Sequence, residues 1–79
     1  MQIQIRYEPV TPTHPDVLAT YILTLDGLEA AGLEHEHGTW RLTYGPDWET
    51  EETFSSRAAA EQFVRDHAAA IKAAHLDTY

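Results

Sequence analysis

The sequence predicts an α+β domain, namely a three- to four-stranded antiparallel β-meander followed by one long C-terminal helix packed on one face of the sheet. Segments in the first two thirds alternate apolar and polar residues with a period of two, and tight-turn dipeptides separate them. The last third instead carries apolar residues at helical spacing. With 79 residues and 43% hydrophobic content, the chain suffices for one small core and is too short for two. We therefore expect residues 1–79 to form a single domain.

The first strand is expected over residues 2–8. There Ile3, Ile5 and Tyr7 fall on one side and polar residues on the other, which is typical of a half-buried strand. Residues 9–16 hold three of the four prolines of the chain. Proline lacks a backbone donor and disfavours helical geometry in the residue before it, so we expect a stiff surface loop here.

Two hairpins are predicted next. Asp26-Gly27 is a favoured type I′ turn dipeptide, and a turn there would pair Leu25 with Leu28 and Leu23 with Ala30. His37-Gly38 offers a second tight turn, which would pair His35 with Trp40 and Leu33 with Leu42. The two registers present opposite faces of the middle strand to the core. One extra residue inverts the face of a strand, so we expect a β-bulge near Ala30-Ala31-Gly32. The expected strands are residues 18–25, 28–36 and 39–44, and residues 50–54 can return as a further short strand that brings Phe54 near Trp40.

A helix is predicted over residues 56–75, with Ser55 or Ser56 as its N-cap. About twenty residues form a rod of roughly 30 Å, long enough to cross the sheet. Glu61 and Arg65 have the spacing of a helical ion pair. The expected apolar stripe comprises Ala60, Phe63, Val64, His67, Ala68, Ile71 and Ala74.

Composition excludes several classes of function. Cysteine is absent, which removes disulfides, thiolate catalysis and cysteine-ligated zinc. Thirteen acidic residues against five basic ones give a net charge of −8, without the Lys/Arg cluster that nucleic acids or anionic membranes require. We find no signal-peptide pattern and no apolar run of membrane-spanning length, so we expect a cytoplasmic protein. The acidity points to basic partners, or only to solubility or the host environment.

Catalytic patterns are also missing. The sequence has no nucleophile elbow, no phosphate-cradling glycine loop and no predicted concave pocket to separate the pKa values of two carboxyls, so we expect neither enzymatic activity nor a cofactor. His35 and His37 are two residues apart and share a face if both lie on a strand, where they could approach one metal ion. Alternatively, His35 packs beside Trp40 and His37 is a solvated turn residue, so no metal site is expected. His67, on the helical stripe, is expected to be a hydrogen-bonded, partly buried ring.

The strongest candidate site is an acidic turn around a tryptophan. Tryptophan is enriched at the centres of protein interfaces, and carboxylates around it would steer a basic partner. The alternative is that Trp48 folds back to cap the edge of the core while the acids are merely solvated. The candidate partner-binding residues are Asp47, Trp48, Glu49, Glu51 and Glu52, extended by Glu34 and Glu36 on the neighbouring hairpin.

Size, acidity, lack of cysteine and the expected sheet-plus-helix build together resemble, in general character, the small phage-encoded accessory proteins that include anti-CRISPRs. The resemblance implies an inhibitor that occludes a basic, nucleic-acid-binding surface of a larger protein. Two alternatives stay open. One is a structural or regulatory homodimer that pairs through an exposed strand edge. The other is a histidine-dependent metal-binding or pH-responsive protein, since protonation of the five histidines would change the net charge.

Overall fold

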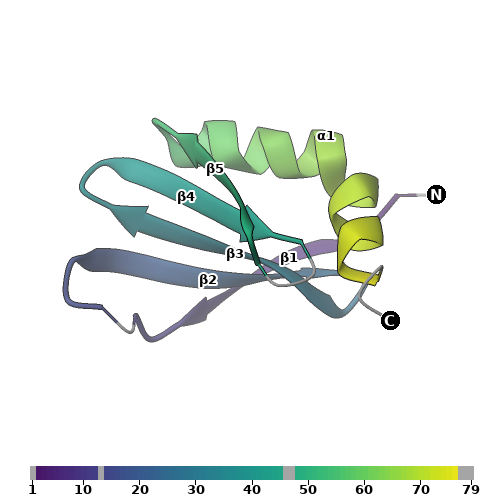
Figure 1. The fold of residues 1–79 in the computed structure, drawn as a ribbon, viewed down its shortest axis with the longest axis horizontal. Helices are drawn as coiled ribbons and strands as arrows, with labels where there is room; N and C mark the ends of the chain where they lie inside the picture. The colour runs from purple at the N-terminus through teal and green to yellow at the C-terminus, as the bar shows by residue number, and fades with distance from the viewer. Residues whose placement is uncertain (1, 13, 46–47, 77–79) are drawn as a thin grey trace.

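The computed structural model describes residues 2–12, 14–45 and 48–76. In this part of the chain five antiparallel strands form one meander sheet, with each strand beside its sequence neighbours, and a C-terminal helix packs against β3, β4 and β5 (Figure 1). The α+β fold is therefore confirmed, and residues 50–54, which were expected to be able to return as a further short strand, form the fifth strand. The elements are β1 (Ile5–Val10), β2 (Val17–Leu25), β3 (Leu28–Glu36), β4 (Thr39–Tyr44), β5 (Thr50–Phe54) and α1 (Arg57–Leu76).

The first strand lies later than predicted. β1 covers Ile5–Val10 and pairs with β2 as far as Val10, so Pro9 belongs to a strand and not to the expected loop. A proline is tolerated there because β1 is at the edge of the sheet, where an outward-facing position needs no ladder donor.

Both predicted hairpin turns are confirmed by their backbone angles. Asp26 and Gly27 have φ of 52° and 84°, and His37 and Gly38 have φ of 50° and 76°, as a type I′ turn requires. The expected bulge is confirmed as well. Leu23 pairs with Ala31 and Thr24 with Glu29, which leaves Ala30 as the extra residue. The predicted pairing of Leu23 with Ala30 is therefore wrong, because the bulge at Ala30 shifts the partner of Leu23 to Ala31.

The core lies between the helix and one face of the sheet. The buried positions concentrate in residues 23–25 of β2 and residues 30–33 of β3, and the bulge lets β3 match the inward faces of both β2 and β4. Half-buried side chains, among them Phe54 and Phe63, surround the fully buried ones. The buried cluster comprises Leu23, Leu25, Ala30, Ala31, Leu33, Leu42, Ala60, Val64 and Ile71.

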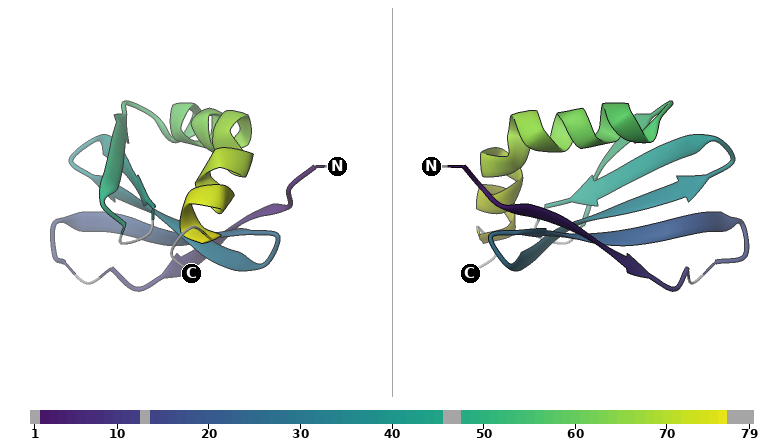
Figure 2. Two further views of the ribbon diagram at one scale, coloured as in Figure 1. Left: turned by 45° about the vertical axis from the view of Figure 1, so that its right-hand side comes forward. Right: turned by 180° about the vertical axis from the view of Figure 1, so that it is seen from behind.

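The helix begins as predicted but is not straight. Ser56 is the N-cap, because its hydroxyl accepts a hydrogen bond from the backbone N–H of Ala59 at 3.2 Å. At His67 the backbone leaves helical geometry (φ −121°, ψ 15°), and the second half of α1 turns sharply toward the end of the sheet (Figure 2). The predicted straight rod is therefore wrong. The kink keeps Ile71 buried and brings Lys72 Nζ within 2.8 Å of Asp26 in the β2–β3 turn.

His67 itself is exposed, not partly buried as expected. Its Nδ1 lies 3.0 Å from the carbonyl oxygen of Phe63, and its ring stacks on that of Phe63 at 4.2 Å. A side chain that bonds the carbonyl four residues back competes with the helical ladder, which fits the position of the kink. No helix among the described residues is long and apolar enough to span a bilayer.

Candidate protein-binding surface

The sheet has one face that the helix does not cover, here called the helix-free face. Because residues along a strand alternate between faces, the neighbours of the buried Leu33 and Leu42 point to this side. The register places Glu34, Arg41 and Thr53 side by side in one row of this face. Gly32, Thr43 and Glu51 form the next row. Two of the predicted site residues, Glu34 and Glu51, are thereby brought together from strands on either side of β4.

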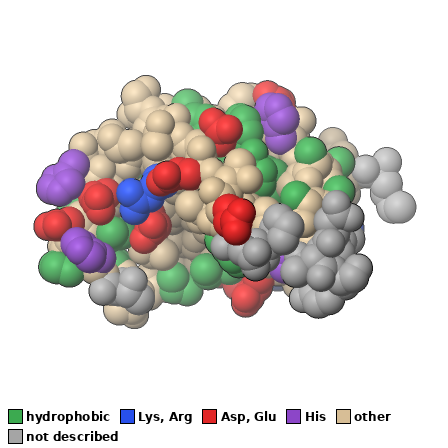
Figure 3. Space-filling view, in the orientation of Figure 1, with side chains coloured by type: hydrophobic (Ala, Val, Ile, Leu, Met, Phe, Trp, Pro, Cys, Tyr) green, Lys and Arg blue, Asp and Glu red, His purple; other side chains and the backbone are tan. Residues whose placement is uncertain are grey.

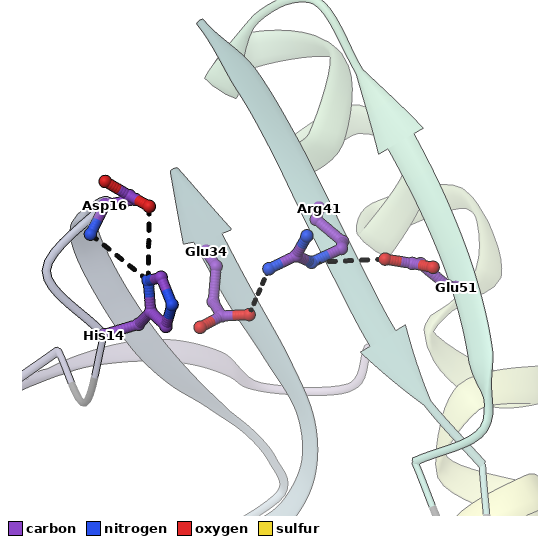
Figure 4. A network of polar contacts seen from close by, with 5 residues as sticks. All are labelled: His14, Asp16, Glu34, Arg41 and Glu51. Carbon is purple, nitrogen blue, oxygen red and sulfur yellow. Dashed lines mark hydrogen bonds and ion pairs between the residues drawn. The ribbon is translucent and has the colours of Figure 1, made fainter. Parts of the chain in front are cut away.

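Arg41 links these two carboxylates. Its guanidinium lies 2.9 Å from Glu34 and 3.1 Å from Glu51, and the three side chains form a line across the sheet (Figure 4). The hydrogen bond to Glu34, together with the nearby charges of Glu34, Glu36 and Glu51, raises the pKa of Arg41 above its ordinary value. Both ion pairs are partly exposed, so water and salt screen them. Arg41 thus fixes the positions of two acids without neutralising the surface.

His14 lies at the start of the turn that leads into β2 and contacts Asp16 (Figure 4). Its Nδ1 accepts a hydrogen bond from the backbone N–H of Asp16 at 3.2 Å and lies 3.8 Å from the Asp16 carboxylate.

Trp48 folds back onto the sheet yet stays partly accessible. A Cβ placed on Gly32 would lie 3.2 Å from Cζ3 of the indole, so the ring rests directly on the β3 backbone. The ring lies on the helix-free face, and Trp48 as a whole is 38% exposed. It therefore does fold back, but onto the face opposite the core. Trp48 has a φ of 60°, a value that few non-glycine residues adopt.

The other predicted site residues fall in three places. Glu36 is half-buried, lies on the same face as Glu34 and helps to line a hollow of ≈ 260 Å³ with Arg41 and Glu51. Glu49 is exposed just before β5. Glu52 pairs with Leu42 and so belongs to the opposite, helix side of the sheet, where it is exposed. Asp47 lies outside the described residues.

We define the acidic face as Glu34, Glu36, Trp48 and Glu51 with Arg41 at its centre. In the space-filling view, acidic side chains surround a basic one over the strands of the sheet (Figure 3). The backbones of β3 and β5 lie roughly 10 Å apart, and the Arg41 guanidinium between them draws the carboxylates of Glu34 and Glu51 closer together. This arrangement can attract and hydrogen-bond the guanidinium or ammonium groups of a partner, while the exposed indole edge supplies apolar contact.

The two histidines considered for metal binding do not share a face. His35 stacks on Trp40 with ring centroids 4.2 Å apart and planes 3° from parallel, on the helix side. His37 is in the turn with a positive φ. Among the described residues no group of three histidine, aspartate or glutamate side chains is arranged to hold a metal ion. The arrangement matches the alternative in which His35 packs beside Trp40.

An aromatic cluster around Arg57 was not predicted. Cζ of Arg57 lies 4.7 Å from the ring centroid of Tyr21, 5.7 Å from that of Tyr7 and 5.9 Å from that of Trp40. Its guanidinium also bonds Glu61 at 2.7 Å, so the expected partner of Glu61, Arg65, is replaced. Periodicity places Arg57 on the polar side of the helix and gives no signal that it reaches across to the sheet.

Comparisons with protein-family models, with curated proteins and with solved structures find no match for this chain.

Proposed function

We propose that the protein is a small acidic protein-binding module whose acidic face docks on the basic, nucleic-acid-binding surface of a larger protein and occludes it. The observation that carries the proposal is the placement of Trp48 among carboxylates on a face of the sheet that no helix covers. Interfaces place aromatic anchors at their centres and use surrounding charges to steer the partner. A surface that grips phosphates presents clustered Lys and Arg, to which carboxylates can bond as phosphates do.

The geometry of Arg41 supports a binding role for the acids. Glu34 on β3 and Glu51 on β5 are held by one guanidinium from the strand between them, so little side-chain freedom remains to be lost when a partner binds. Glu36 has no ion pair within the described residues and can accept a basic group directly. The net charge of −8 adds long-range attraction, which accelerates association at low salt.

The test is capture of a partner followed by competition with nucleic acid. Immobilised protein is incubated with lysate, and each captured protein is purified and assayed for binding of short duplex DNA and RNA with and without the module. We expect the module and the nucleic acid to exclude each other. A ternary complex that contains both would overturn the proposal.

Matched variants locate the contact. Glu36→Lys and Asp66→Lys change the net charge equally, but Asp66 is exposed on the helix, away from the acidic face. We expect Glu36→Lys and Trp48→Ala to lose the partner and Asp66→Lys to keep most of the affinity, with circular dichroism confirming that all three fold. Equal losses in the two charge-reversal variants would show that net charge, and not this face, attracts the partner.

A further inference from the structure

The sheet has two edge strands, β1 and β5, because each pairs on one side only. An edge strand presents unpaired backbone N–H and C=O groups and can pair with a further strand. Which residues present these groups follows from the hairpin turns, since antiparallel neighbours alternate between hydrogen-bonded and non-bonded pairs.

The turn at His37-Gly38 sets this alternation for β5. In a two-residue hairpin the flanking pair, Glu36 and Thr39, is hydrogen-bonded, so every second residue of β4 bonds to β3. The intervening residues of β4, Trp40, Leu42 and Tyr44, bond to Phe54, Glu52 and Thr50 of β5. It follows that the backbone groups of Glu51 and Thr53 point outward from the sheet. No backbone hydrogen bond to either residue from outside the sheet is found in the described part of the chain.

The other edge strand, β1, is protected from pairing with a further strand. The turn at Asp26-Gly27 makes Leu25 and Leu28 a bonded pair, so alternate residues of β2 bond to β1, and Pro9 points outward. Proline has no N–H to offer a new strand, and its ring obstructs the approach. Edge prolines are a recognised means of preventing edge-to-edge pairing. β5 carries no proline, so the two edges differ in their capacity to accept a strand.

The side chains of β5 select the kind of strand that can be added. Glu51 lies on the helix-free face and Glu52 on the helix side, and both are exposed. A second copy of β5 would bring four carboxylates together, and like charges opposite each other destabilise paired strands. A segment with two adjacent basic residues would instead place one beside Glu51 and the next beside Glu52.

We propose that the β5 edge binds an extended, dibasic segment of a partner protein by strand addition, with the backbone of Glu51 and Thr53 forming the hydrogen bonds. The proposal rests on the proposed function only in taking the partner to be basic. Strand addition draws affinity from main-chain bonds and specificity from alternate side chains. The five residues of β5 offer two outward-facing positions, so the added segment is short.

The probe is the synthetic peptide Thr-Val-Arg-Arg-Val-Thr, with Thr-Val-Glu-Glu-Val-Thr as its control, titrated into the isotopically labelled full chain. In the free protein we expect fast amide exchange at Glu51 and Thr53 and slower exchange at Glu52. Binding of the arginine peptide should slow exchange at Glu51 and Thr53, and the glutamate peptide should have no effect. Protection at Glu51 and Thr53 without peptide, caused by pairing with a second copy, would overturn the proposal.

Two variants separate backbone pairing from charge. Thr53→Pro removes one outward N–H and leaves the bonds to β4 intact, so we expect binding to weaken about tenfold or more, while Thr53→Val binds normally. Glu52→Lys keeps the backbone and should weaken binding about fivefold at low salt. Unchanged affinity in folded Thr53→Pro would refute strand addition. Because Trp48 rests on Gly32 of β3 and does not line the hollow that Glu51 and Thr53 share with Glu36, loss of partner capture in Trp48→Ala with normal peptide binding distinguishes the two proposals.

Discussion

Substitution of Arg41 by glutamine should weaken the fold and strengthen the binding of a basic partner. Arg41 holds Glu34 at 2.9 Å and Glu51 at 3.1 Å, and its side chain is 32% exposed. Exposed ion pairs contribute about 0.2–1 kcal/mol each, so their loss lowers the free energy of unfolding by roughly 0.5–2 kcal/mol. The repulsion of Glu34, Glu36 and Glu51, which the guanidinium no longer offsets, contributes within this range.

The same change improves the acidic face as a ligand for cations. One positive charge is removed from its centre, and a charge about 6 Å away in water interacts by roughly 0.7 kcal/mol at low salt. We therefore expect a basic peptide or partner to bind about threefold more tightly. The two effects have opposite signs, which is the expected relation when a structural charge is placed within a binding surface.

Urea unfolding and peptide titration, each at low and high salt, measure both effects. Arg65→Gln is the matched control, since Arg65 is exposed on the helix and its guanidinium bonds Gln62 at 2.9 Å. Added salt should remove most of the difference between Arg41→Gln and the wild type. Weaker peptide binding by Arg41→Gln, or equal changes in the Arg65→Gln control, would refute the assignment of Arg41 to the centre of the binding surface.

Three further predictions concern packing and pH. Gly32→Val should lower the free energy of unfolding by about 1–3 kcal/mol, because the new side chain would overpack against Trp48. In a double-mutant cycle the loss should be clearly smaller in a Trp48→Ala background, and equal losses in both backgrounds would mean that the indole does not rest on Gly32. Ile71→Ala should lower the free energy of unfolding by about 2–4 kcal/mol, because Ile71 lies beyond the kink and is only 1% exposed. Ala70→Ser, at an exposed position, should have little effect, and a small loss for Ile71→Ala in thermal unfolding would contradict the packing of the second half of α1. The hydrogen bonds from Lys72 and from the Gln4 backbone lower the pKa of Asp26 below its ordinary value. They therefore stabilise the fold at pH values above the ordinary pKa of an aspartate, and this stabilisation is lost as the pH falls through the lowered pKa. In urea unfolding at a series of pH values, Lys72→Met should reduce the loss of stability on the acid side, and an unchanged pH profile would contradict the pairing of Lys72 with Asp26.

The turns and the bulge could be predicted because their causes are local. Asp26-Gly27 and His37-Gly38 each fix a turn type, and two turns of fixed type impose a parity conflict on β3 that one extra residue resolves. The side of the sheet on which Glu52 lies also follows from the sequence. Phe54 is expected to approach Trp40 on the core side, and Glu52, two residues earlier on the same strand, must share that side, although it is also predicted to belong to the acidic turn around Trp48.

The remaining features depend on contacts between distant segments. Pro9 in isolation indicates a loop, and only the strand order shows that it occupies an outward position of an edge strand. Gly32 signals a close approach to the backbone, but nothing local identifies Trp48 as the approaching group. The helical periodicity continues unbroken through His67, so the kink appears only when the helix is packed around the end of the sheet.

The few basic residues of this acidic chain are placed where they hold parts of the fold together. Arg41, Arg57 and Lys72 each form an ion pair with a carboxylate. The carboxylates that pair with Arg41 and Lys72 belong to other strands or turns, so these two cations connect separate parts of the fold. Within the described residues, Glu36, Glu49 and Glu52 have no ion pair, and they lie at β5 or on the hairpin before it. A basic group bound to Glu36, Glu49 or Glu52 would break no internal pair, whereas one bound to Glu34 or Glu51 would share that carboxylate with Arg41. We therefore expect added salt to weaken the binding of a basic segment more steeply than it weakens the fold.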